Sequence, residues 1–163
     1  MSSSEGDASS GPSIWVDADA CPGPVRDILF RAAERTQTPL TLVANKPLRT
    51  PGSRVIRALQ VPRGFDEADR RIVELVAPGD LVVTGDLPLA AKLLARGARV
   101  LEPRGEWIDA NTIGERLAVR GLLEGLRESG VATGGPPPLS HADRQAFANR
   151  VDAYFADIAR RKG

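Results

Sequence analysis

A short apolar segment that ends in two carboxylates is the feature that most constrains this chain. Residues 14–16 (Ile-Trp-Val) are apolar and partly β-branched, which is typical of a buried strand. Asp17 and Asp19 follow, and the alternation of a strand predicts that their side chains share one face. Pro22 then ends the extended segment and a helical pattern begins. The segment therefore predicts an α/β sheet with two acids at its carboxyl edge, where such sheets bind ligands.

The rest of the chain alternates between strand and helix patterns. We expect strands at residues 14–16, 40–44, 54–61, 81–83 and 99–101, and helices at residues 24–37, 66–78, 88–97, 109–129 and 140–161. Strands that alternate with helices favour a parallel sheet covered on both faces. The fold class expected is α/β, a single-domain three-layer sandwich with a mainly parallel sheet and extra C-terminal helices.

Composition limits the domain count and the environment. The 163 residues are 42% hydrophobic and 26% charged, as in a single soluble domain. Residues 1–12 are rich in Ser and Gly and predict a disordered leader, so the domain is expected at residues 13–162. No apolar run reaches the roughly 18 residues of a membrane span, and one cysteine predicts a reducing cytoplasm. The net charge of +1 gives no global attraction to nucleic acid.

Capping patterns mark three of the expected helix starts. Each pairs a capping residue with an acid three positions later: Asp66 with Asp69, Thr112 with Glu115, and Ser140 with Asp143. The last helix carries an apolar stripe of Phe147, Val151, Tyr154, Phe155 and Ile158. This stripe has to pack on the sheet or on another subunit, so a homodimer through the C-terminal helix is one expectation.

Four acids lie where the expected strands end or the expected helices begin: Asp17, Asp19, Asp69 and Asp86. If their strands are neighbours, the carboxylates meet at one edge and form a site of oxygen ligands, which selects Mg²⁺ or Mn²⁺ over Zn²⁺. Asp17, Asp69 and Asp86 are the expected metal ligands. Polar groups within reach of a bound phosphate are Asn45, Lys46, Asp66, Thr84 and Arg104. The alternative is that these acids only cap helices or face solvent.

Cys21 and His141 are weaker candidates for chemistry. Cys21 follows the acidic pair at a predicted helix start, where a thiolate is favoured. A nucleophilic cysteine needs a base, and the only histidine, His141, is far along the chain. We therefore interpret Cys21 as a packing residue and His141 as a surface residue of the last helix.

Seven segments resemble one bacterial family when taken in order. They are DADACP at residues 17–22, VANKPL at 43–48, GFDEAD at 64–69, GDLVVTGD at 79–86, PRGE at 103–106, GGP at 134–136 and DRQAFAN at 143–149. Together they resemble the YaiI/YqxD family of uncharacterised bacterial proteins over about residues 13–160. That family is similar to the PIN-like and NYN nuclease fold, a parallel α/β sheet with an acidic metal centre. The resemblance implies that Asp17, Asp69 and Asp86 are the acids of that centre.

One position departs from the nuclease pattern. Many PIN-like sites carry another acid two residues after the last one, where this chain has Pro88. The leading hypothesis is a metal-dependent phosphodiesterase acting on RNA, assisted by Asp19 or Asp66. A module that binds nucleic acid or nucleotides without cleaving them is the alternative. A small-molecule phosphatase with Asp17 as nucleophile and Asp19 as acid is the weakest of the three, because no convincing lysine motif accompanies the pair.

Overall fold

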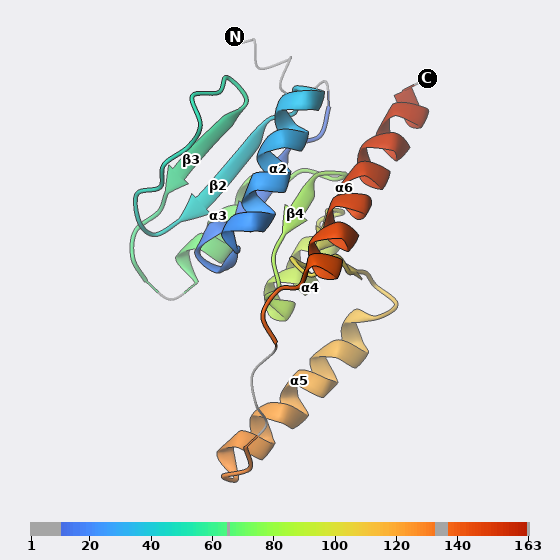
Figure 1. Ribbon diagram of the computed structural model, residues 1–163. Coiled ribbons are helices and arrows are strands. Elements are labelled where there is room, and N and C mark those ends of the chain that lie inside the picture. The colour runs from blue at the N-terminus through green and yellow to red at the C-terminus, as the bar shows by residue number, and fades with distance from the viewer. Residues whose placement is uncertain (1–10, 65, 133–136, 163) are drawn as a thin grey trace.

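One six-stranded sheet runs through the computed structural model, which describes residues 11–64, 66–132 and 137–162 (Figure 1). Its strands are β1 (Ile14–Asp17), β2 (Leu40–Ala44), β3 (Ile56–Gln60), β4 (Leu81–Val83), β5 (Arg99–Leu101) and β6 (Trp107–Ile108). The strand order is β3-β2-β1-β4-β5-β6. All neighbours pair parallel except β5 and β6, which pair antiparallel. The mainly parallel sheet is confirmed, and β6 is a strand that the sequence pattern did not predict.

Helices cover both faces of the sheet, which confirms the three-layer α/β sandwich (Figure 1). The helices are α2 (Gly23–Thr36), α3 (Glu67–Leu75), α4 (Leu87–Ala95), α5 (Ile113–Glu128) and α6 (His141–Lys162), with a short 3₁₀ turn, η1, at Ala18–Ala20. α2 and α6 pack on one face of the sheet, and α3 and α4 pack on the other. α5 projects away from the body of the molecule.

Alternation along the strands divides the apolar core between the two faces. Ile14 and Val16 of β1 point toward α2 and α6, while Trp15 points toward α3 and α4. The middle strands are buried on both faces, as parallel strands under two helical layers must be. Because Asp17 is two residues after Trp15, the same alternation directs its side chain to the α3 and α4 face.

The order of the strands places a topological switch point between β1 and β4. From β1 the chain passes through α2 to β2 and β3 on one side, and then through α3 to β4 on the other side of β1. This reversal is a topological switch point, and ligands of open α/β sheets bind just outside the carboxyl ends of the two strands that flank it. The expected acids Asp17 and Asp86 follow these two strands.

The apolar stripe of α6 packs on the sheet of its own chain. Phe147, Val151 and Tyr154 are buried in the α2 face of the core, whereas Phe155 and Ile158 are half-buried. The buried part of the stripe is therefore not available to a second copy, and nothing in this packing supports a homodimer through the C-terminal helix.

A turn after β5 fixes the start of α6. Gly105 has a φ of +90°, and a Cβ at this position would lie 2.6 Å from the backbone nitrogen of Phe147. Only glycine allows this close approach of backbone to helix. Arg104 beside it pairs with Asp143 of α6 at 2.8 Å. The capping box of Ser140 and Asp143 is confirmed, since each backbone N–H donates to the side chain of the other at 3.0 Å.

The other two capping predictions were wrong. Asp66 precedes α3 in a left-handed conformation with φ of +65°, and its side chain accepts no capping hydrogen bond. Thr112 precedes α5, but its hydroxyl turns back to the carboxylate of Asp109 at 3.2 Å. Asp109 Oδ1 also accepts the backbone N–H of Thr112 at 3.0 Å, so an earlier residue closes this turn.

Two further predictions concern membrane-spanning helices and the N-terminal leader. Within the described ranges, no helix is both long enough and apolar enough to cross a membrane. The predicted disordered leader lies mostly outside the described residues, which begin at Gly11.

Candidate functional site

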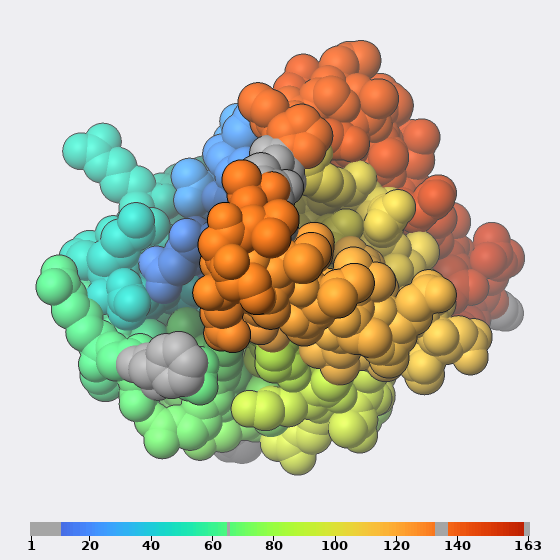
Figure 2. Space-filling model, turned by 90° about the horizontal axis from the view of Figure 1, so that it is seen from below, coloured from blue at the N-terminus to red at the C-terminus, as the bar shows by residue number. Residues whose placement is uncertain are grey.

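The candidate site lies at the carboxyl edge of the sheet, at the ends of the neighbouring strands β1 and β4. Figure 2 views the molecule onto this edge, with the blue segment after β1 visible between the cyan loop after β2 and the green start of α3. Three acids come to this edge from different elements: Asp17 ends β1, Asp69 lies in the first turn of α3, and Asp86 precedes α4. The expected gathering of acids at one edge therefore occurs.

Asp17 is the buried member of the site. Its side chain follows Trp15 on the α3 and α4 face, and the residue is only 8% exposed. Burial raises the pKa of Asp17, and the charges of Asp86 and Asp19 raise it further, while a hydrogen bond from Thr84 lowers it. The alternative that Asp17 is merely solvated is therefore wrong.

Thr84 joins the two strand-end acids. Val16 of β1 pairs with Val83 of β4, so Thr84, the next residue after Val83, lies beside Asp17. Thr84 is only 2% exposed. The Thr84 hydroxyl oxygen accepts the backbone N–H of Asp86 at 3.1 Å and lies 3.0 Å from Asp17 Oδ2. Because an ionised carboxylate only accepts, the hydroxyl proton is donated to Asp17. Thr84 thus sets the spacing of Asp17 and Asp86.

Asp86 is both an exposed acid of the site and a helix cap. Its Oδ1 accepts the backbone N–H of Leu89 at 3.0 Å, which caps the start of α4. The capping alternative is therefore correct for one oxygen of this carboxylate. Its negative charge still acts on the site, since it contributes to the raised pKa of both Asp17 and Asp69.

Asp69 is the acid that a helix brings to the site. It is the third residue of α3, a helix that packs on the same face of β1 as the Asp17 side chain. Burial raises the pKa of Asp69 to about 6, with further contributions from the charges of Asp86, Asp17 and Asp66 and from a hydrogen bond with Asp66. A half-buried carboxyl with three acids around it is poised to titrate near neutral pH.

Asp19 does not extend the strand, so the alternation argument for it was wrong. The chain turns into η1 at Ala18, and Asp19 lies exposed on that turn. Its carboxylate accepts the backbone N–H of Asn45 at 3.1 Å, which ties the turn after β1 to the loop after β2. It does not cap α2 either, because Pro22 occupies the cap position without a side-chain hydrogen bond. Asp19 therefore borders the site and positions Asn45.

The five predicted phosphate contacts separate into three groups. Thr84 and Asp66 belong to the acidic group, through Asp17 and Asp69 respectively. Asn45 is half-buried and Lys46 is exposed, and both lie in the loop held by Asp19. Arg104 instead directs its guanidinium to Asp143 and to the carbonyl of Pro137, so it fastens α6 rather than facing the acids.

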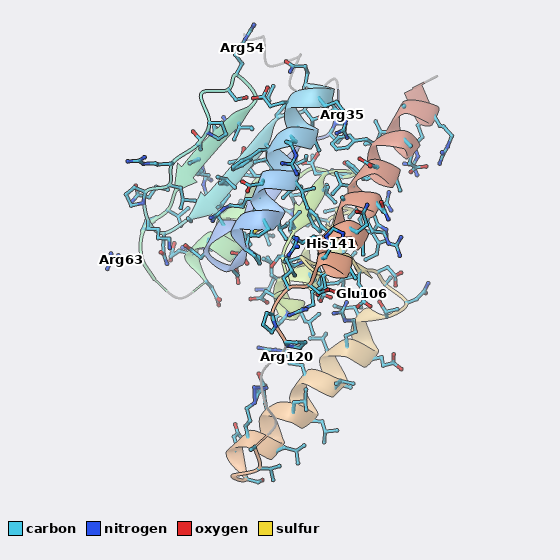
Figure 3. All side chains as sticks on the ribbon, viewed as in Figure 1. Arg35, Arg54, Arg63, Glu106, Arg120 and His141 are labelled. Atoms are coloured by element: carbon cyan, nitrogen blue, oxygen red, sulfur yellow. The ribbon has the colours of Figure 1, made fainter. Side chains whose placement is uncertain are left out.

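Cys21 and His141 take the places that the sequence predicted. Cys21 is buried in the core under α2, and burial raises the pKa of its thiol to about 12, so it stays protonated at neutral pH. His141 is exposed at the first residue of α6 and lines a groove against Pro24 and Ile28 of α2 (Figure 3). Neither residue belongs to the acidic group.

The acids are gathered, but they are not arranged as a finished metal cage. Among the described residues, no three Asp, Glu, His or Cys side chains lie close enough together to hold one ion as they stand. Mg²⁺ usually keeps several waters and binds proteins through only one or two carboxylates. The arrangement therefore fits an ion with one or two direct carboxylate ligands and others that act through water.

One buried acid of the opposite edge was not singled out from the sequence. Asp80 precedes β4 at the amino edge and accepts three hydrogen bonds of 2.9 Å, from the backbone N–H groups of Ser13 and Ala77 and from Trp15 Nε1. It borders a cavity of about 470 Å³ that Tyr154 and Arg99 also line. The pairing of one acid with a tryptophan 65 positions away has no local sequence signal.

Comparison with known proteins identifies relatives over most of the chain. The family described as "Uncharacterized BCR, YaiI/YqxD family" matches residues 15–157. A UPF0178 protein of Bordetella petrii is 61% identical over 147 residues, covering 90% of this chain and 98% of the relative. A UPF0178 protein of Klebsiella pneumoniae is 59% identical over 150 residues, covering 92% and 99%. No solved structure matches the chain, so the similarity to PIN-like nucleases stays a prediction.

Proposed function

The chain belongs to the YaiI/YqxD family, and we propose that it is a nuclease that uses Mg²⁺ or Mn²⁺ to hydrolyse phosphodiester bonds of RNA. The observation that carries the proposal is the gathering of Asp17, Asp69 and Asp86 at the switch point of the sheet. Burial raises the pKa of Asp17 and Asp69, and the negative charges of the neighbouring carboxylates raise both further. A divalent cation relieves the repulsion between these charges and gives the cluster a role that packing alone does not.

The donor atoms determine which ion fits. Carboxylate oxygens and the hydroxyl of Thr84 are hard ligands, which favour Mg²⁺ or Mn²⁺, while the one cysteine lies in the core as a protonated thiol. In this assignment Asp17 and Asp86 hold the ion, because Thr84 fixes the spacing of these two residues. Asp69 completes the site directly or through water.

The bound ion would orient a water and stabilise the charge that develops on the phosphate. The remaining residues act on the substrate. Lys46 and Asn45, in the loop after β2, offer a cation and an amide to a phosphate oxygen. Asp66 hydrogen-bonds to Asp69, and Asp19 holds the backbone of Asn45, so these two acids position other groups. RNA as the substrate rests on the resemblance to PIN-like and NYN nucleases.

The test is Mn²⁺-dependent cleavage of a labelled single-stranded RNA by the wild type and by Asp17→Asn. We expect the substitution to lower cleavage by orders of magnitude, because the buried carboxylate of the site is lost. Asp152→Asn is the matched control: this acid is exposed on α6 and pairs with Arg35, so the variant should cleave like the wild type. Equal activity of all three proteins would refute the assignment.

The part of the chain that the structure describes has no preformed three-ligand cluster, which favours one alternative, a module that binds RNA or nucleotides without cleaving them. The two functions differ in what a metal does. If the protein is a nuclease, bound RNA is cleaved when Mn²⁺ is added, and Asp17→Asn abolishes this cleavage. For a binding module, RNA binds with or without metal and stays intact at any enzyme concentration. Gel-shift and cleavage measurements on the same samples separate the two.

A further inference from the structure

α5 stands apart from the rest of the molecule, so its long sides face solvent (Figure 1). It runs for 16 residues, and none of them is buried. Its first turns touch the body through the half-buried Ile113 and through an ion pair between Arg116 and Glu102. It also contacts α4, and beyond these contacts the C-terminal part of the helix extends away from the sheet.

The sequence of α5 is a poor one for a helix that stands alone. It contains Gly114, Gly121 and Gly125, and each glycine in a helix interior costs up to about 1 kcal/mol relative to alanine. An isolated helix of about 15 residues is marginal in water even when its sequence is favourable. A Cβ at any of these glycines would meet nothing within 4 Å, so packing within the chain does not require them. Packing against a partner would therefore add stability that the sequence of α5 does not supply by itself.

One side of α5 has the composition of an interface. Val119 is 51% exposed, Leu122 65%, Leu123 38% and Leu126 37%. These four residues follow a 3-1-3 spacing, which places them on one stripe of a helix. They are the largest exposed apolar side chains of the helix, and Val131 just beyond its end is 47% exposed. Contiguous apolar side chains on a soluble surface mark a binding site.

The spacing of the stripe allows α5 to pair with a second copy of itself. A 3-1-3 pattern reads the same in both directions, so two antiparallel copies present the same stripe to each other. Val119 of one copy then faces Leu126 of the other, and Leu122 faces Leu123. We propose that α5 is a dimerisation arm, which pairs antiparallel with α5 of a second copy of this chain. Such an interface is isologous, as the contacts of most homodimers are.

Charge favours a second copy over nucleic acid on this helix. α5 carries three arginines and three glutamates, so its formal charge is zero. A phosphate backbone gains little from a neutral helix with an apolar stripe, whereas two neutral helices approach without repulsion. Arg120 in addition pairs with Glu124 on the same helix, at 3.3 Å. Figure 3 shows Arg120 on the part of α5 nearest the body.

The arm also borders the candidate site of its own chain. Val119 and Leu123 share an open groove of about 310 Å³ with Leu87, the first residue of α4 and the neighbour of Asp86. A paired α5 that covers Val119 and Leu123 would line this groove from the other side. The dimer proposal does not depend on the nuclease proposal, because it rests on the exposure and spacing of α5 alone.

The first test is the mass of the full chain in solution, measured by light scattering over a range of concentrations. The paired helices make a small interface, so we expect a dimer that dissociates on dilution in the micromolar range. Leu122→Glu should make the protein monomeric without unfolding it, since this side chain is mostly exposed. Glu124→Ala, two residues away on the opposite side of α5, should leave the dimer intact.

A chain that is monomeric up to millimolar concentration would overturn the proposal, and so would a dimer that Leu122→Glu leaves unchanged. If the chain is monomeric and Leu122→Glu abolishes RNA binding, the stripe binds nucleic acid. That result would also overturn the dimer proposal.

The second test is the orientation of the pair, measured by disulfide cross-linking. The native Cys21 is buried, so an introduced cysteine reports alone. A mixture of Val119→Cys and Leu126→Cys should oxidise to a covalent mixed dimer. Either variant by itself should cross-link far less, because antiparallel pairing separates identical positions by about 10 Å along the helix. Strong cross-linking of Val119→Cys with itself would indicate parallel helices and contradict the antiparallel arm.

Discussion

The two edges of the sheet each bury one aspartate and surround it with opposite chemistry. At the amino edge Asp80 receives three N–H donors, which match its negative charge. At the carboxyl edge Asp17 receives the Thr84 hydroxyl and lies near the charges of Asp86 and Asp19. The first arrangement stabilises the fold, because buried carboxylates are favourable when their hydrogen bonds are satisfied. The surroundings of Asp17 lower the stability of the fold locally, because like charges lie close together, and a bound cation would remove this repulsion.

The largest expected difference between the edges is the cost of losing each carboxylate. Asp80→Asn should lower the free energy of unfolding by roughly 3 kcal/mol, because either orientation of the amide sets its NH₂ group against a buried N–H donor. Asp17→Asn should cost less than about 1 kcal/mol, since Asn can still accept from Thr84 and relieves repulsion. Urea unfolding of both variants checks this, and equal losses would remove the contrast.

Metal binding should affect only the carboxyl edge. A divalent ion that binds the native state stabilises it by about 2.7 kcal/mol at a hundred times the dissociation constant. We expect Mn²⁺ or Mg²⁺ at millimolar concentration to raise the melting temperature of the wild type and of Asp152→Asn. Asp17→Asn should show little change, and EDTA should reverse the shift. An unchanged melting curve of the wild type would argue against a metal site.

The acids of the carboxyl edge should also make stability depend on pH without metal. The pKa of Asp69 is about 6 in the folded state, against about 3.9 for an unfolded aspartate. The folded state therefore binds more protons at Asp69 between these values, so the contribution of Asp69 to stability is fully present below pH 4 and is lost as the pH rises through 6.

Asp69 is half-buried, so solvent screening leaves an effect of about 1 kcal/mol. In EDTA, Asp69→Asn should reduce the dependence of the free energy of unfolding on pH. The remaining dependence should come from Asp17, whose pKa is also raised. A stability that rises between pH 4 and 6 in the wild type, with no change in Asp69→Asn, would contradict this origin.

The smallest expected change in stability is that of Asp86→Asn. Asn caps helices as well as Asp does, so α4 should keep its cap to Leu89 and the free energy of unfolding should change by less than about 0.5 kcal/mol. Affinity for Mn²⁺, measured by calorimetry, should nevertheless fall. Equal affinity of the wild type and the variant would leave Asp86 as a cap alone.

The sheet and its acidic edge could be predicted because their signals are local. An apolar β-branched run fixed residues 40–44 as a strand, and β2 has the same bounds. Asp17 and Asp86 follow such runs, and alternation with helices makes the strands parallel, so their carboxyl ends meet. The resemblance to the YaiI/YqxD family, confirmed over residues 15–157, pointed to the same acids.

The remaining errors concern short turns and pairings that leave no periodic pattern in the sequence, and packing between elements far apart in the chain. Asp19 left the strand face because the chain turns at η1, and Thr112 lost its capping role to Asp109. β6 has only two residues and pairs with a strand just before it, so no periodicity reveals it. Helical periodicity identified the apolar side of the last helix. It could not show that this side packs on the sheet of the same chain.

The position of α6 also has a consequence for how the chain is made. Phe147, Val151 and Tyr154 cover a face of the sheet whose strands come from residues 14–108, so the helix that closes this core is synthesised after all the strands it covers. Until α6 docks, a nascent chain exposes the apolar residues of β1, β2 and α2 to its surroundings. Such intermediates aggregate or recruit chaperones, so folding yield should depend on how quickly the turn at Gly105 captures the helix.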